Sequence, residues 1–312
     1  MKPLVAVTET LSPAAMTWLR SKCEVVQASP GNATFVSHAP RVQGLVVRTL
    51  TQVDHALVRS LPALKVVGRA GVGLDNIDLQ ACRERDVTVV STPDANTQAV
   101  VEYVLSLLCD AMRPRVFLDT PVDAEAWERM RSEICGVKQM DECTLGILGL
   151  GRIGSRVAQV ASAIGFEVLY NDLRAIPVEQ RHGATPVSIE RLFAESDVLT
   201  LHIDGRPSNR HAVNASLIAS MKSDALLLNT CRGFVLDHEA LRDFLAGNRG
   251  AQALLDVHEP EPFGADHPLL ELPNAHLAPH LASRTRTAME RMSWVVRDVV
   301  AVIHDQSPQF PA

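Results

Sequence analysis

Several signals of common protein classes are missing from this sequence. Its six cysteines show no Cys-x-x-Cys spacing, so they indicate neither a disulfide framework nor a zinc site, and scattered thiols are typical of reduced cytoplasmic proteins. No run of about 18 apolar residues is present, so the sequence predicts no transmembrane helix. The net charge is −6, the pI is about 6.0 and no basic stripe appears; we therefore expect no nucleic-acid partner.

We also expect no leader at the start of the chain. The first residues run directly into an apolar, strand-like segment with no long hydrophobic region and no cleavage site, so we expect no signal peptide and a cytoplasmic location. Internal repeats and low-complexity tracts are absent. What is present is an ordinary globular composition, with 312 residues of which 46% are hydrophobic and 21% charged. This length and composition predict about two domains.

Short apolar runs alternate with longer amphipathic stretches along the chain, which predicts parallel strands joined by helices. The runs expected to be buried strands are residues 4–7, 23–27, 44–47, 64–69 and 88–91, then 145–149, 167–172, 198–202, 225–229 and 253–257. Helical patterns cover residues 12–21, 54–60, 78–85, 96–113, 152–164 and 284–304. The stretch 114–141 is polar and irregular.

The pattern therefore predicts two α/β units, at about 1–95 and 110–282. A lone terminal helix must pack somewhere, and packing onto the first unit would make that domain discontinuous. We accordingly expect one domain of residues 1–98 plus 284–312 and a second of residues 99–283. The fold class is α/β, with two doubly wound parallel-sheet domains.

A glycine-rich loop in the second unit predicts a dinucleotide site. Gly149, Gly151 and Gly154 form a G-x-G-x-x-G between an apolar strand and an amphipathic helix, where they allow a tight turn, close approach of a pyrophosphate and close helix packing. Asp172 follows Gly154 by 18 residues, and a carboxylate there would bind the ribose 2′-hydroxyl of NAD and repel the 2′-phosphate of NADP. Arg174, two residues after Asp172, mildly favours NADP over NAD.

Three ionisable residues downstream suit hydride transfer to or from a 2-hydroxy acid. Arg232 can bind a carboxylate, His280 can move a proton, and Glu261 can orient the histidine. Glu259 is an alternative to Glu261 as the residue that orients His280, because each glutamate precedes a proline. His276 and His280 have the i,i+4 spacing of a metal pair, but a proline between them argues against a helix and no third ligand is evident, so we expect no metal.

With these motifs in this order, the chain resembles the D-2-hydroxyacid dehydrogenase family. The most specific resemblance is residues 221–237, Met-Lys-Ser-Asp-Ala-Leu-Leu-Leu-Asn-Thr-Cys-Arg-Gly-Phe-Val-Leu-Asp. Residues 44–48, 67–78 and 127–129 are similar to segments of the D-3-phosphoglycerate dehydrogenases within it. The resemblance implies a flavodoxin-like domain and an NAD-binding Rossmann domain with the active site in a cleft between them. After His280 only 32 residues remain, so no regulatory ACT-type domain is expected.

The resemblance also implies roles for individual residues. The catalytic set would be Arg232, Glu261 and His280. The cofactor NAD would be bound by Gly149, Gly151, Arg152, Ile153, Gly154, Asp172, His202, Thr230, Cys231 and Asp256, with Cys231 acting as a small packed residue, not as a nucleophile. The substrate would be bound by Arg48, Arg69, Gly71, Val72, Gly73 and Arg129. Two arginines on one site suit a dianion, and Arg129 would come from a neighbouring subunit.

The substrate stays open at this stage. The family resemblance favours a phosphorylated or phosphonylated 2-hydroxy acid such as 3-phosphoglycerate. Glyoxylate, hydroxypyruvate or a D-lactate-type substrate is the alternative, and an NAD-sensing corepressor-like protein is a reading of another class. Residues 203–210 depart from the family pattern, with Asp204, Gly205 and Arg210 in unusual places. The resemblance further implies a homodimer through the NAD-binding domain, with residues 114–141 as the candidate arm.

Overall fold

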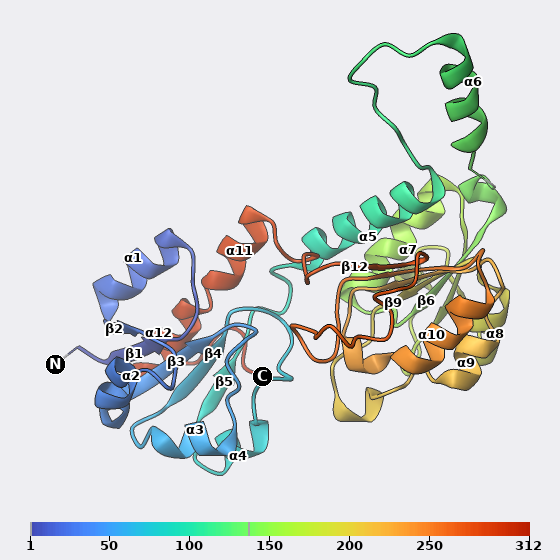
Figure 1. Ribbon diagram of the computed structural model, residues 1–312. Coiled ribbons are helices and arrows are strands. Elements are labelled where there is room, and N and C mark those ends of the chain that lie inside the picture. The colour runs from blue at the N-terminus through green and yellow to red at the C-terminus, as the bar shows by residue number, and fades with distance from the viewer. Residues whose placement is uncertain (1, 137) are drawn as a thin grey trace. The chain divides into compact units, whose positions relative to one another are not determined.

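The computed structural model describes residues 2–136 and 138–312, so that Met1 and Val137, the latter inside the expected arm, lie outside the described residues. The chain divides into two compact units: unit 1 comprises Met1–Ala99 and Ser283–Ala312, and unit 2 comprises Val100–Ala282. Each unit is built on its own parallel β-sheet (Figure 1). The prediction of a two-domain α/β fold with parallel sheets is confirmed.

Unit 1 contains a five-stranded sheet in the order β2-β1-β3-β4-β5, a flavodoxin-like order. Its strands are β1 (Leu4–Val7), β2 (Glu24–Gln27), β3 (Val42–Val47), β4 (Val66–Arg69) and β5 (Thr88–Val90). Its helices are α1 (Pro13–Lys22), α2 (Ala33–His38), α3 (His55–Ser60), α4 (Leu79–Arg83), α11 (Arg286–Ser293) and α12 (Val296–Ile303). The expected terminal helix is thus two shorter helices, separated at Trp294 and Val295.

Helix α12 packs directly on β3 and β4, because both strands carry a glycine beneath it. A Cβ atom on Gly68 would lie 2.4 Å from Val299, and one on Gly44 would lie 2.9 Å from the same valine. Val299 is fully buried. The two glycines therefore let the last helix of the chain complete one face of the unit 1 core.

Unit 2 contains a seven-stranded sheet in the order β12-β11-β10-β9-β6-β7-β8, in which the chain order reverses between β6 and β9 as in a dinucleotide-binding fold. Its strands are β6 (Thr144–Leu148), β7 (Glu167–Asn171), β8 (Thr185–Pro186), β9 (Val198–Leu201), β10 (Leu226–Asn229), β11 (Gln252–Leu255) and β12 (Ala275–Leu277). Its helices are α5 (Thr97–Met112, which starts in unit 1), α6 (Ala124–Glu133), α7 (Arg152–Ile164), α8 (Ile189–Glu195), α9 (Ala215–Ala219) and α10 (His238–Gly247).

The segment expected to be irregular contains helix α6. Asp123 caps its first turn by accepting a hydrogen bond from the Ala126 amide, which satisfies an otherwise unpaired donor. None of its side chains is buried, so the sequence carries no apolar face from which a helix could be recognised. Figure 1 shows α6 and its flanking loops projecting from the body of unit 2.

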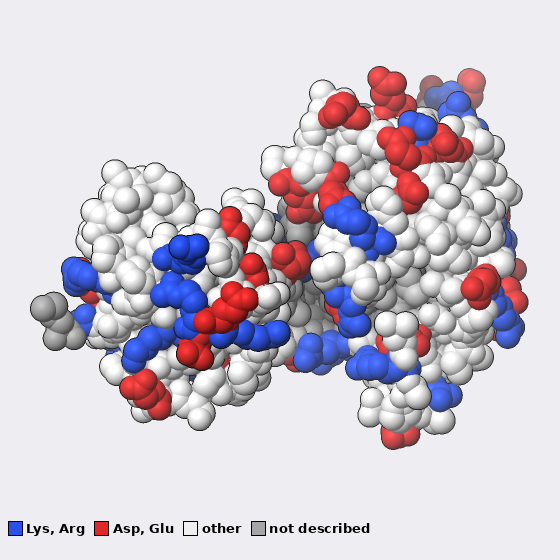
Figure 2. All heavy atoms as spheres, turned by 90° about the horizontal axis from the view of Figure 1, so that it is seen from below, with Lys and Arg blue, Asp and Glu red and all other residues white. Residues whose placement is uncertain are grey.

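Charged side chains of both signs lie interspersed on the face shown in Figure 2. Within the part of the chain that the structure describes, no helix is both long and apolar enough to span a bilayer.

Candidate active site

Three adjacent strands of the unit 2 sheet lead to the three predicted catalytic residues. Arg232 follows β10, Glu261 follows β11, and His280 follows β12. These strands are neighbours and parallel, so their carboxyl ends lie along one edge of the sheet. This edge is where ligands bind in open parallel sheets.

Glu261 and His280 are in direct contact. Glu261 Oε2 lies 2.7 Å from His280 Nδ1, and Glu261 Oε1 accepts a hydrogen bond of 2.8 Å from the His258 amide. Burial alone would raise the pKa of the Glu261 carboxyl, but the hydrogen bonds from His280 and His258 outweigh it and hold this pKa below its ordinary value. Glu261 is therefore an ionised partner for the imidazole, whose Nε2 is left for a substrate.

The competing carboxylate, Glu259, has a different partner. It forms a two-point ion pair with Arg210, with Nη1 2.7 Å from Oε2 and Nη2 2.5 Å from Oε1. The hydrogen bond and charge of Arg210 lower the pKa of Glu259. The two glutamates, which sequence reasoning could not separate, thus have distinct partners, and the unusual Arg210 of the 203–210 loop serves to hold Glu259.

The backbone around His280 is held by Asp256, a fully buried carboxylate at the end of β11. Its two oxygens accept hydrogen bonds from the amides of Leu281 (2.7 Å) and Ala282 (2.8 Å). The carbonyl of Asp256 accepts from the His280 amide (2.9 Å). These bonds fix a turn in which His280 has φ +54°, an uncommon conformation that histidine tolerates. The contacts of Asp256 show that it anchors the histidine turn, and the binding of cofactor by Asp256 stays a prediction.

Arg232 is placed by a compact turn after β10. The side chain of Asn229 donates to the Arg232 carbonyl (2.9 Å) and accepts from the Cys231 amide (3.0 Å). A Cβ atom on Gly233 would lie 2.1 Å from the backbone of His258, so only glycine allows the arginine turn to pack against the turn that carries Glu261. Burial raises the pKa of the Cys231 thiol to about 11, which makes it a packed neutral group.

The glycine-rich loop has the geometry that a dinucleotide requires. Gly149 has φ +92°, and a Cβ atom on Gly154 would lie 2.1 Å from the Gly149 carbonyl, so both positions need glycine for protein packing. Gly151 differs, because a Cβ atom there would meet nothing within 4 Å. Open space before the first residue of α7, the exposed Arg152, suits phosphates bound at a helix N-terminus. Ile153 packs against the core behind the loop.

Two further predicted cofactor residues lie at the ends of the two strands that flank β6. Asp172, after β7, accepts hydrogen bonds from the amides of Leu150 and Arg174 (2.8 Å each). Burial alone would raise the pKa of Asp172, but these bonds and the Arg174 side chain outweigh it and lower that pKa. His202, after β9, lies 2.9 Å from Thr200 through Nε2, and burial lowers its pKa to about 3. The histidine is therefore a neutral group.

The buried hydroxyl of Thr230 fits the binding of a cofactor. Its hydroxyl oxygen is buried and has no hydrogen-bond partner among the described residues. A buried polar atom of this kind costs stability unless something satisfies it. Thr230 lies at the same sheet edge as Arg232, where the resemblance places the nicotinamide amide.

The predicted substrate residues divide between the units. Arg48, Arg69 and the loop of Gly71, Val72 and Gly73 lie in unit 1, at the carboxyl ends of β3 and β4. The Gly71 amide donates to the Arg69 carbonyl (2.8 Å), and the binding of substrate by this loop stays a prediction. Arg129 lies exposed on α6 in unit 2, and its role in binding substrate stays a prediction.

Sequence reasoning missed two residues that the structure connects to this machinery. Tyr103, on α5, shares a hydrogen bond with the Asp256 carboxylate. The position of Tyr103 on the helix that precedes the glycine-rich unit is the sequence signal that could have identified it. Arg284, after the histidine turn, is a charge neighbour of Arg48. Among residues 2–136 and 138–312 no cluster of three or more His, Cys, Asp or Glu is arranged to bind a metal.

Residues 105–282 match the family described as D-isomer specific 2-hydroxyacid dehydrogenase, NAD binding domain. This match covers more than half of the chain, and the chain therefore belongs to the D-isomer-specific 2-hydroxyacid dehydrogenase family. The predicted family and the predicted cofactor, NAD, are confirmed.

Individual relatives differ in what they act on. The chain is 35% identical to (S)-sulfolactate dehydrogenase of Chromohalobacter salexigens, covering 95% of this chain and 96% of that one. It is also 35% identical to glyoxylate reductase of Aeropyrum pernix, covering 95% and 91%. It is 32% identical to D-3-phosphoglycerate dehydrogenase of Archaeoglobus fulgidus over 96% of this chain, but spans only 56% of that relative's length.

Among solved structures, the TT0316 protein from Thermus thermophilus is similar with a TM-score of 0.85. It is 32% identical to this chain, and the match covers 99% of both. The fold is therefore shared over nearly the whole length, in both units.

Proposed function

We propose that this protein is an NAD-dependent dehydrogenase that interconverts a small D-2-hydroxy acid and its 2-oxo acid. The observation that carries the proposal is the Glu261–His280 pair, with 2.7 Å between Oε2 and Nδ1, on the same sheet edge as the Arg232 turn. When bound, NAD supplies the hydride acceptor, and Gly149–Gly154, Asp172 and Thr230 are the residues that would hold it.

The chain's own residues perform the proton chemistry. In oxidation, His280 Nε2 accepts the proton of the substrate hydroxyl, because Nδ1 is occupied by Glu261. The ionised Glu261 stabilises the imidazolium that forms. In reduction, the imidazolium returns the proton to the developing alkoxide, and the Arg232 guanidinium stabilises the negative charge on that oxygen. Arg232 also binds the substrate carboxylate.

For the substrate we propose a 2-hydroxy acid with a second, strongly anionic group, such as a phosphorylated, phosphonylated or sulfonated acid. Support comes from Arg48 and Arg69, two buried arginines at the ends of adjacent strands in unit 1. It also comes from the likeness to a sulfolactate and a phosphoglycerate dehydrogenase. Glyoxylate is the alternative, supported by an equally similar relative.

A substrate panel tests the reaction and the substrate. Oxidation of NADH would be followed with 3-phosphohydroxypyruvate, 3-sulfopyruvate, hydroxypyruvate, pyruvate and glyoxylate, using the native protein, His280→Ala and Arg232→Ala. We expect turnover with an anionic substrate and losses of about 100-fold or more in both variants, the scale of general acid–base and electrostatic catalysis. Near-native turnover in either variant would contradict the assigned roles, and inertness toward every acid would favour an NAD-binding regulatory protein.

We further propose that the protein is a homodimer in the cytoplasm. The arm of unit 2 exposes a run of apolar side chains, Val116 (53%), Phe117 (87%) and Leu118 (44%), and Trp127 (51%) on α6. Burial of such a group against a second copy would be favourable. All six cysteines are unpaired, as is usual in a reducing compartment. Sedimentation of the native chain and of Phe117→Asp would test the dimer, since the variant should sediment as a monomer.

A further inference from the structure

His258 lies in unit 2, in the segment between β11 and β12, and touches the turns of two predicted catalytic residues through its backbone. Its amide donates to Glu261 Oε1 (2.8 Å). A Cβ atom on Gly233, the residue after Arg232, would lie 2.1 Å from the His258 backbone, so the arginine turn packs directly against it. The residue is only 6% exposed. The backbone of His258 therefore fixes the arginine turn and the glutamate turn to one another.

The imidazole of His258 reaches the turn of the third catalytic residue. Its Nε2 lies 2.8 Å from the Ala278 carbonyl, and because a carbonyl can only accept, the ring must donate. The same carbonyl accepts a hydrogen bond from the His280 amide (3.1 Å). One carbonyl thus joins the His258 ring to the backbone of His280. Asp256 holds the residues that follow His280, whereas His258 holds a residue that precedes it.

Packing alone does not account for a histidine at position 258. With the proton on Nε2, the Nδ1 atom carries a lone pair, and this atom is buried without a hydrogen-bond partner among residues 2–136 and 138–312. A buried polar atom of this kind lowers stability. The ring meets Phe263 edge to face, with 4.5 Å between the ring centroids, a contact that a phenylalanine could also make. The property that the imidazole adds is its hydrogen bond to Ala278.

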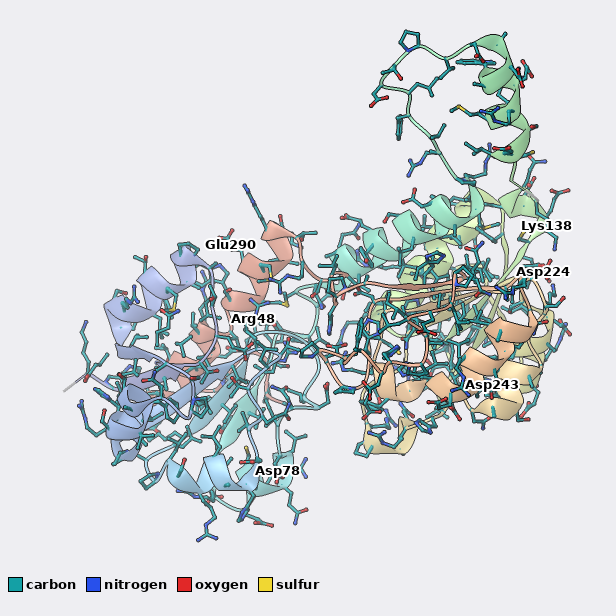
Figure 3. The ribbon with its side chains drawn as sticks, in the orientation of Figure 1. Arg48, Asp78, Lys138, Asp224, Asp243 and Glu290 are labelled. Atoms are coloured by element: carbon teal, nitrogen blue, oxygen red, sulfur yellow. The ribbon has the colours of Figure 1, made fainter. Side chains whose placement is uncertain are left out.

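A second buried imidazole lies beside His258 without reaching the catalytic turns. The ring centroid of His267 is 5.6 Å from that of His258 and 5.2 Å from that of His238. His238 is the first residue of α10, the helix that carries the labelled Asp243 in Figure 3. The Nδ1 atom of His267 accepts from the Leu269 amide (3.4 Å), and its Nε2 has no partner among the described residues. His267 is therefore a matched control for His258.

We infer that His258 is a positioning residue for the proposed reaction, whose imidazole holds the backbone of His280 at the distance from Glu261 that proton transfer requires. The inference rests on the proposed function and deepens it. A small displacement of a catalytic group from its productive geometry lowers the rate of the chemical step. Loss of the hydrogen bond from the His258 ring should therefore lower kcat and leave the binding of substrate nearly unchanged.

The experiment compares two replacements of His258 that separate its hydrogen bond from its packing. His258→Phe keeps a ring and removes the donor, whereas His258→Gln removes the ring and can place an amide donor near the position of Nε2. We would measure kcat and KM in NADH oxidation with the 2-oxo acid of the panel that the native protein reduces fastest. His258→Phe should lower kcat by about 5- to 10-fold, the scale of one hydrogen bond, with KM within about twofold. His258→Gln and the control His267→Phe should both keep kcat within about twofold of the native value.

Two further measurements do not depend on turnover. The thermal midpoint of His258→Phe should stay within about 4 °C of the native value, because the replacement loses a hydrogen bond but also removes an unpaired buried nitrogen. Hydrogen exchange would be followed by mass spectrometry on peptides that cover residues 278–282. Exchange there should be about 5- to 10-fold faster in His258→Phe, since the turn opens more readily. It should be native-like in His258→Gln and in His267→Phe.

The outcomes separate the inference from the proposed function. If the native protein reduces none of the acids but exchange in residues 278–282 depends on the donor, the proposed reaction fails and the hold of His258 on the turn stands. If an acid is reduced and His258→Phe is at least as active as His258→Gln, the ring acts by packing and the inference is overturned. A loss that falls on KM, or an equal loss of kcat in His267→Phe, would also overturn it.

Discussion

Tyr103 donates its hydroxyl hydrogen bond to the carboxylate of Asp256, linking the middle of α5 to the end of β11. That carboxylate also accepts the amides of Leu281 and Ala282. Tyr103 therefore acts on the turn of His280 through one intermediate residue, as a positioning residue. Burial raises the pKa of Asp256, whereas the tyrosine hydrogen bond favours the ionised form.

Replacing Tyr103 by phenylalanine should move the acid limb of the pH profile upward. Loss of the hydrogen bond raises the pKa of Asp256 further, so the carboxylate is protonated, and the histidine turn loosened, at a higher pH than in the native protein. We expect a fall in kcat of about 3- to 10-fold near neutral pH, matching the typical net contribution of one hydrogen bond. The measurement is kcat/KM against pH.

The control is Tyr170→Phe, which changes the only other tyrosine of the chain, a buried residue of β7. It should leave the acid limb where it is. An unchanged acid limb in Tyr103→Phe would show that the tyrosine only packs.

Replacing Glu259 and Glu261 one at a time should distinguish their roles. Glu261→Gln removes the carboxylate that stabilises the His280 imidazolium, and we expect kcat to fall by about 100-fold. Glu259→Gln breaks an exposed ion pair with Arg210, which is worth at most about 1 kcal/mol, so kcat should stay within about threefold. Steady-state kinetics on both variants would check this, and equal losses would argue against Glu261 as the partner of His280.

Asp172 should control the choice between the two dinucleotides. Asp172→Ser removes the charge that opposes a 2′-phosphate and leaves Arg174 beside the site. Binding of NADH should weaken by about tenfold and binding of NADPH should strengthen, since an arginine near this position accommodates the phosphate. Titration of protein fluorescence with each nucleotide measures both constants. Ser188, the N-cap of α8, offers a control in Ser188→Thr, which keeps a capping hydroxyl and should alter neither constant.

Acid should destabilise the fold through buried histidines. Burial, and then the neighbouring imidazoles of His267 and His258, lower the pKa of His238 to about 4. The unfolded chain, with an ordinary histidine pKa of about 6.5, binds more protons between these values. The free energy of unfolding is therefore highest above a pH of about 6.5 and falls as the pH drops from there toward about 4. Urea unfolding near neutral pH and at about pH 5 measures the loss.

The histidine cluster can be tested by His238→Phe, which keeps a ring but cannot titrate. The difference between the two pH values should shrink in this variant. It should persist in His55→Asn, a change at an exposed histidine. A native-like pH difference in His238→Phe would place the acid sensitivity elsewhere.

The strand–helix alternation could be predicted from the sequence because buried parallel strands are continuous apolar runs. Helix α6 could not, since it buries no side chain, and β8, with two residues, is too short to show a pattern. The distinction between Glu259 and Glu261 rests on Arg210, 49 residues distant in sequence from Glu259, and local spacing carries no such information. Arg284 stands in an exposed polar stretch without a motif, so its electrostatic effect on Arg48 could not be predicted from the sequence.

The close packing of α12 on Gly44 and Gly68 has a consequence for biosynthesis. Unit 2 is one continuous stretch and has its whole core once Ala282 has been made, whereas the face of β3 and β4 stays uncovered until Val299 has been synthesised. Domains generally fold as units during synthesis, so the order of maturation is the reverse of the order of translation. The strands of unit 1 precede unit 2 in the chain but are covered after it, and a chain truncated before residue 296 would leave this apolar sheet face exposed.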